Sequence, residues 1–96
     1  MVKHIVLFKF MEEKKESDMN TLIEKLRELP DKIDLIRSYE VGANVVEGPR
    51  NYDVALVSTF DSLEDLKAYA ACDPHTEFIE FMKTCVEDVK VLDYEY

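Results

Sequence analysis

The chain has 96 residues, 47% of them hydrophobic, and a formal net charge of -9 from 21 acidic and 12 basic residues. This length fits one domain over residues 1–96, with a small core that oligomerisation would help to bury. The negative charge argues against binding to nucleic acid or anionic membranes, both of which need basic contacts. No apolar stretch is long enough to cross a bilayer and no signal-peptide pattern begins the chain, so we expect a cytoplasmic protein.

The first third of the chain predicts a strand and then a helix. Residues 2–10 alternate as in a strand and are largely apolar on both sides. Apolar residues then recur at spacings of three and four, which predicts a helix over roughly 18–29. Ser17 or Asp18 is the expected N-cap, and Pro30 is expected to end the helix.

The middle of the chain predicts two further strands. Residues 35–46 read as an extended segment in which Gly42 suggests a bulge or a bend. A turn or short loop over residues 47–51 separates this segment from a strand over residues 52–60, which is rich in β-forming residues.

The last third predicts an interrupted helix and a final strand. Asp61 or Ser62 is expected to cap the helix at its start. Asp73 and Pro74 then interrupt and restart it, as N-cap and first helical residue of the new segment. The final strand is expected over about residues 88–94.

The order of elements is therefore β-α-β-β-α-β, the ferredoxin-like arrangement of the α+β class. It predicts a four-stranded antiparallel sheet with both helices on one face. The other face would expose a large apolar patch, so we expect a second copy to cover it, sheet against sheet, in a closed or nearly closed barrel. The barrel interior could hold a ligand, and we assign His4, Val6 and Phe8 to this pocket face.

Two histidines and a tyrosine are the main candidates for chemistry. His75 would lie at a helix start, where the partial positive charge favours the neutral imidazole that a general base needs. Tyr69, six residues earlier, could reach the same pocket and donate to a developing enolate oxygen. His4 would point into the pocket from the first strand. Plainer interpretations stay open: a packing histidine, a core-edge tyrosine and a hydrogen-bonded core histidine.

Other polar residues carry weaker signals. Cys72 and Cys85 match neither a redox nor a zinc spacing and are interpreted as small core residues. Asp53 and Asp93 are unusual because they are acids within strands, and Asp93 could cap a sheet edge or pair across a dimer. No ligand spacing predicts a metal site, and no cofactor is expected.

The sequence resembles the stress-responsive dimeric α/β-barrel domain family over essentially its whole length. The segments that carry the resemblance, in the expected order, are residues 2–10, 52–60, 62–66 with Tyr69, Pro74-His75 with Phe78, and 91–94. The resemblance implies a homodimer whose two sheets enclose a barrel. Most family members have no assigned reaction.

One plant member of this family closes a linear polyketide by aldol condensation without a metal or organic cofactor. Its base is a histidine helped by a tyrosine, and another histidine lies on its first strand. Those positions align with His75, Tyr69 and His4 here. The chain departs from that enzyme at residues 70–73, where Ala-Ala-Cys-Asp replaces a segment that holds a further histidine.

We therefore expect a cofactor-independent enzyme that performs acid–base chemistry on a small carbonyl compound, such as cyclisation, isomerisation or lyase-type proton transfer. His75 is the expected base, Tyr69 the proton donor, and His4, Val6 and Phe8 are pocket residues. The alternatives are a non-catalytic barrel that binds an apolar metabolite and a stress-response protein that acts through its assembly. Haem-linked oxygenation, known on related barrels, has only a lone histidine in its favour.

Overall fold

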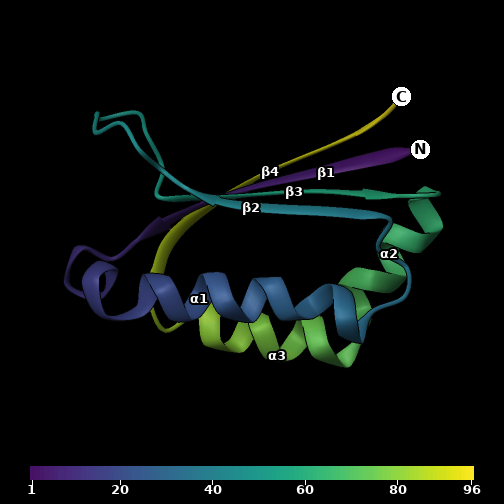
Figure 1. Cartoon of the computed structure of the whole chain (residues 1–96), viewed down its shortest axis with the longest axis horizontal. Helices are drawn as coiled ribbons and strands as arrows, with labels where there is room; N and C mark the ends of the chain where they lie inside the picture. The colour runs from purple at the N-terminus through teal and green to yellow at the C-terminus, as the bar shows by residue number, and fades with distance from the viewer.

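The computed structural model describes all 96 residues as a four-stranded antiparallel sheet with its helices on one face (Figure 1). The elements in chain order are β1 (Val2–Phe10), α1 (Glu12–Lys32), β2 (Ser38–Ala43), β3 (Val54–Phe60), α2 (Leu63–Ala71), α3 (Asp73–Met82) and β4 (Val86–Glu95). The strand order is β2-β3-β1-β4. The ferredoxin-like prediction is confirmed, with the second helix divided into α2 and α3. None of the helices is both long and apolar enough to span a membrane.

The first helix, α1, is longer at both ends than the sequence pattern predicts. Met11 is its N-cap and gives no side-chain hydrogen bond, so the predicted cap at Ser17 or Asp18 is wrong. The charged run that precedes the apolar pattern is helical, and its leading acids lie favourably at the positive end of the helix dipole. Pro30 lies inside the helix, which continues to Lys32, so the loss of one N–H donor near the C-terminus does not end it.

The strand β2 is shorter than predicted and pairs regularly with β3. The register is continuous from Ser38 to Ala43, so the predicted irregularity at Gly42 is wrong. The register shift of the sheet lies instead between Lys9 and Phe10, where β1 pairs with β4.

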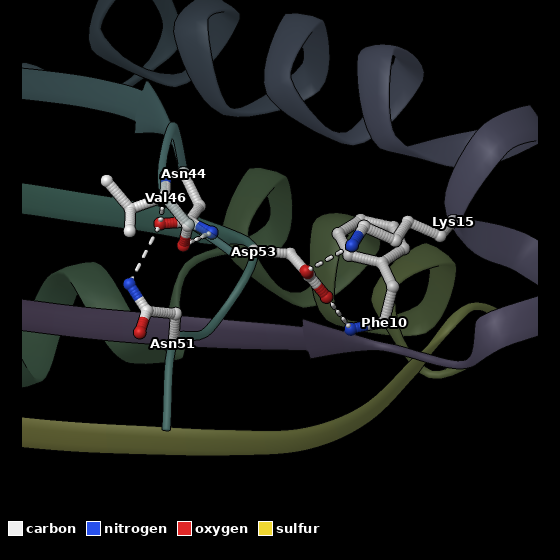
Figure 2. A network of polar contacts seen from close by, with 6 residues as sticks. All are labelled: Phe10, Lys15, Asn44, Val46, Asn51 and Asp53. Atoms are coloured by element: carbon white, nitrogen blue, oxygen red, sulfur yellow. Dashed lines mark hydrogen bonds and ion pairs between the residues drawn. The ribbon is translucent and has the colours of Figure 1, made fainter. Parts of the chain in front are cut away.

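Asp53 anchors the loop that connects β2 to β3. Its carboxylate accepts a hydrogen bond from the Phe10 amide at 2.8 Å and forms an ion pair with Lys15 at 2.9 Å (Figure 2). Within the loop, the Asn44 amide hydrogen-bonds the Val46 carbonyl at 2.7 Å. Burial alone would raise the pKa of Asp53, but the Phe10 amide and Lys15 outweigh burial and hold it below its usual range. Asp53 is therefore a structural acid.

The second helical region is interrupted where the sequence predicts. Ser62 caps α2, since its hydroxyl accepts the Asp65 amide at 3.1 Å. The break falls at Cys72, whose backbone is extended (φ -76°, ψ 156°). Cys72 is also the N-cap of α3 and gives no side-chain cap hydrogen bond. The predicted N-cap role of Asp73 is therefore wrong, because Asp73 and Pro74 occupy the first two helical positions.

The core lies between the sheet and the helices. Val6 and Phe8 are 6% and 2% exposed, and the Phe8 ring meets Phe78 of α3 edge-on at a centroid distance of 6.1 Å. The assignment of His4, Val6 and Phe8 to the uncovered face is therefore wrong. These residues share one side of β1 as predicted, but that side faces the helices.

The uncovered face carries the other residues of each strand. Leu7 is 37% exposed and Leu92, which flanks it diagonally across the β1–β4 ladder, is 59% exposed. Further apolar or aromatic side chains on this outer face, by strand alternation, are Ile5, Ala55, Val57 and Tyr94. On this face of β1, Lys3 and Lys9 flank the apolar residues Ile5 and Leu7 at the two ends of the strand.

Candidate active site

A cavity of about 150 Å³ lies between the inner face of the sheet and the helices. Apart from two histidines, every lining residue is aliphatic, aromatic or methionine; the lining comprises His4, Val6, Phe8, Leu26, Leu56, Tyr69, His75, Phe78, Ile79, Met82, Val89 and Val91. Val91, on the edge strand β4, is 55% exposed, and Ile79 and Met82 of α3 are half-buried. The cavity therefore opens to solvent between β4 and α3.

The cavity belongs to one chain. We expected a pocket inside a barrel formed by two sheets, whereas this cavity lies on the helix side of a single sheet. His4, Val6 and Phe8 line it from β1, and the structure brings Tyr69 and His75 to the same cavity. All five predicted site residues thus meet, at a location different from the expected one.

His75 is held so that one ring nitrogen remains free. Its Nδ1 lies 3.1 Å from the carbonyl oxygen of Ala70. A carbonyl oxygen only accepts, so Nδ1 carries the proton and Nε2 keeps its lone pair. Burial lowers the pKa of His75, the hydrogen bond to Ala70 opposes this, and the charge of His4 lowers the pKa further. The imidazole is therefore neutral near physiological pH, chiefly through burial rather than through the helix dipole that the sequence suggested.

Tyr69 lies between the two histidines. It is 1% exposed, and its ring centroid is 4.6 Å from that of His75 and 6.1 Å from that of His4. Burial raises the pKa of Tyr69 to about 12, although the neighbouring Tyr39 hydroxyl acts in the opposite direction. The phenol therefore keeps its proton and is a hydrogen-bond donor at the cavity.

His4 is oriented by an acid on the neighbouring strand. Asp93 of β4 is directly opposite His4 in the register, and its carboxylate contacts His4 Nδ1. Because a carboxylate accepts, the proton of the neutral His4 ring lies on Nδ1, and Nε2 of that ring carries none. The sequence offered an edge cap or a cross-dimer pair for Asp93, and the structure pairs it within the chain. Antiparallel pairing of the first and last strands is the signal that would have revealed this.

A row of polar side chains crosses the inner face of the sheet at this end of the cavity. It has one member from each strand, Tyr39, Ser58, His4 and Asp93, which face one another across the three ladders. The Tyr39 hydroxyl is buried without a hydrogen-bond partner. The sequence pattern alone does not reveal this polar row, because the strand order must be known to bring its four members together.

The remaining candidates lie outside the cavity lining. Cys85 is fully buried in the core, as predicted, and Cys72 donates through its thiol to the Tyr69 carbonyl at 3.1 Å. His, Cys, Asp and Glu side chains form no group of three that could hold a metal ion.

Comparison with known proteins places this architecture among dimeric relatives. One of them is a dimeric protein of unknown function with a ferredoxin-like fold from Bacteroides fragilis. It is 38% identical in sequence and superposes with a TM-score of 0.87, over 99% of this chain and 95% of the other. An uncharacterised protein of Streptomyces coelicolor is 29% identical over the full length of both chains.

The same fold also occurs in an enzyme. A hydroxynitrile lyase from Passiflora edulis covers 97% of this chain and 90% of its own with a TM-score of 0.83, and at 23% identity it shows the shared fold alone. The family model described as the stress responsive A/B barrel domain matches residues 2–96. The resemblance read from the sequence is thus confirmed, and the chain belongs to the stress responsive A/B barrel domain family.

Proposed function

We propose that the protein is a cofactor-independent enzyme that moves protons on a small carbonyl compound bound in the cavity. The observation that carries this proposal is the convergence of His75, Tyr69 and His4 on an otherwise apolar cavity. A neutral imidazole with a free Nε2 and a protonated phenol are a base and an acid side by side.

The arrangement suits the formation of an enol from a ketone or aldehyde. His75 Nε2 takes the proton from the α-carbon, and the electron pair of that C–H bond forms a carbon–carbon double bond. The carbonyl π electrons move to oxygen, where Tyr69 donates its proton. Return of the proton from His75 to another carbon, while the enol O–H proton goes back to Tyr69 and the carbonyl re-forms, completes an isomerisation. In an aldol closure the enol carbon attacks a second carbonyl, whose oxygen takes the proton from His75, and the enol O–H proton again returns to Tyr69.

His4 and the apolar walls support this step. The Asp93 carboxylate accepts from His4 Nδ1 and holds the ring, so in the neutral ring the Nε2 lone pair can accept a hydrogen bond from the hydroxyl of the enol. Aliphatic and aromatic side chains around the reacting atoms exclude water, which strengthens each polar interaction. The lyase from Passiflora edulis adds support by analogy of fold.

Deuterium incorporation into acetophenone in D₂O, followed by proton NMR, tests this proposal without knowledge of the natural substrate. The wild-type protein should exchange the methyl protons faster than buffer does. His75→Gln should reduce the catalysed rate by about 10²–10⁴-fold, as removal of a positioned base does. Tyr69→Phe should reduce the exchange rate by a smaller factor, because it removes one hydrogen-bond donor and keeps the aromatic ring. Glu80→Gln, on the exposed side of α3, should match the wild type. Equal exchange by His75→Gln and the wild type would refute His75 as the base.

The apolar lining favours one alternative, a binding protein without catalysis. Such a cavity can sequester an apolar metabolite through burial alone. The same experiment separates the two functions, since acetophenone that binds without protein-dependent exchange supports the binding function.

We infer further that two copies pair through the outer faces of their sheets. The exposed Leu7 of the inner strand β1 and Leu92 of the edge strand β4 lie on that face, where water contact with apolar side chains is unfavourable. The relative from Bacteroides fragilis is dimeric, which supports a homodimer here. The cavity remains outside such an interface, because it lies on the opposite side of the sheet.

A further inference from the structure

We propose that the cavity selects an uncharged compound with one ring-sized apolar body and one carbonyl oxygen, and that it rejects carboxylates, phosphates and other anions. This inference rests on the cavity that the proposed function uses and adds the class of compound that it accepts. Three features of the structure carry it: the absence of a cation, the cavity volume, and the segregation of polar groups to one end.

No lysine or arginine lines the cavity. The lysines of the strands β1 and β4 alternate with the lining residues and so project from the outer face of the sheet. Lys90, for example, lies opposite Leu7. A buried anion would therefore lose its hydration without gaining an ion pair, which is strongly unfavourable.

The charge already at the polar end also opposes an anion. The Asp93 carboxylate contacts Nδ1 of His4, so this histidine already has an acidic partner. The chain as a whole carries a net charge of -9. A carboxylate or phosphate entering the cavity would meet repulsion both from Asp93 and from the protein's overall field.

The volume of the cavity matches one small ring. It measures about 150 Å³. An apolar protein cavity of about 150 Å³ is large enough to hold benzene. The opening between β4 and α3 leaves room for a short substituent, and Met82 at this side can adapt to its shape.

The polar groups are gathered at one end and set the orientation of the compound. There Tyr69 contacts the rings of both His4 and His75. The other end is formed by Phe8, Phe78 and further apolar residues. A compound with a single carbonyl therefore places its oxygen at Tyr69 and its body against the phenyl rings, whereas a second polar group on the body would be left without a partner.

Binding of three probes of similar size tests this inference: acetophenone, which is uncharged, benzoate, which is anionic, and benzylammonium, which is cationic. Binding is measured by NMR shifts of the methyl groups of Ile79, Val89 and Leu56, which line the cavity. Acetophenone should shift these signals with saturation, and benzoate should bind at least about tenfold more weakly. Benzylammonium should also bind more weakly than acetophenone, because its charged group would likewise lose its hydration inside the cavity.

Val91→Lys places a cation at the mouth of the cavity, on a side chain exposed enough to tolerate it. This variant should narrow or reverse the preference for acetophenone over benzoate, while Val91→Thr, which adds no charge, should keep it. Benzoate or benzylammonium binding to the wild type as tightly as acetophenone, with the same cavity shifts, would overturn the inference. The inference would also be overturned if acetophenone failed to shift the NMR signals of the cavity methyl groups.

These outcomes separate the inference from the proposed function. Acetophenone binding that excludes benzoate, without proton exchange, would refute the enzymatic function and leave the selectivity standing. Proton exchange that depends on His75, in a protein that binds benzoate as tightly as acetophenone, would support the enzymatic function and refute the selectivity.

Discussion

At the scale of single residues, the site depends on which nitrogen of each histidine is free. The Ala70 carbonyl fixes the proton of His75 on Nδ1, and the Asp93 carboxylate does the same for His4. Both rings therefore present an unprotonated Nε2 while they are neutral. Tyr69 stays protonated because its pKa is raised to about 12 by burial. The acid and the base are thus ready in one protonation state near neutral pH.

The pH dependence of proton exchange follows from His75. Its pKa is lowered from 6.5, mainly by burial, so exchange should persist as pH falls through 6.5 and decline only below it. Because the unfolded chain takes up this proton first, the free energy of unfolding should also start to fall as pH drops below 6.5. Exchange rates and thermal melts from pH 5 to 8 measure both, with His75→Gln as the control for the melts. An acid limb centred above 6.5 would contradict the burial of this imidazole.

At the scale of elements, the order of strands and helices could be read from periodicity and turn residues, whereas several boundaries could not. The run of Glu and Lys before the apolar pattern suits a helix as well as a solvated connection, so the start of α1 was placed too late. Both sides of β1 are apolar, so alternation identified the residues that share a side but not the side that meets the helices. The partnership of His4 with Asp93 required the β1–β4 pairing.

The two helix starts of the second helical region should respond differently to loss of a polar side chain. Ser62→Ala removes a cap whose hydroxyl accepts the Asp65 amide, and should cost about 1 kcal/mol of unfolding free energy. Asp73→Ala removes no cap hydrogen bond and only a favourable charge at the helix start, so it should cost about 0.3–1 kcal/mol. Urea denaturation of both variants measures the difference. A larger loss for Asp73→Ala than for Ser62→Ala would show that Asp73 caps α3 in solution.

At the scale of the whole molecule, the two faces of the sheet have different surroundings. The inner face joins the core and the cavity, and the outer face carries the exposed apolar group around Leu7 and Leu92. Since the cavity lies within one chain, a dimer of this protein has two equivalent sites. In the proposed dimer, pairing through the outer faces would bury this apolar group and leave the opening between β4 and α3 free.

Aspartate substitutions at two adjacent β1 positions, one on each face of the sheet, should have different effects on assembly and folding. Leu7→Asp places a charge on the outer face, so it should yield a folded monomer at micromolar concentration. Phe8→Asp buries an unpaired charge in the core, which should cost several kcal/mol, on the order of the whole stability of a small domain, and unfold the chain. Sedimentation equilibrium and circular dichroism report the two outcomes. A dimeric, fully stable Leu7→Asp protein would place the interface elsewhere.

A crystal structure of the protein saturated with acetophenone tests the central claim, that the cavity inside each chain is the site of proton transfer. We predict one molecule in every chain, with its carbonyl oxygen at about 3 Å from the Tyr69 hydroxyl and its methyl carbon facing His75 Nε2. Acetophenone lodged between the two sheets of a dimer, or in the cavity with its oxygen turned toward Phe8 and Phe78, would contradict the account.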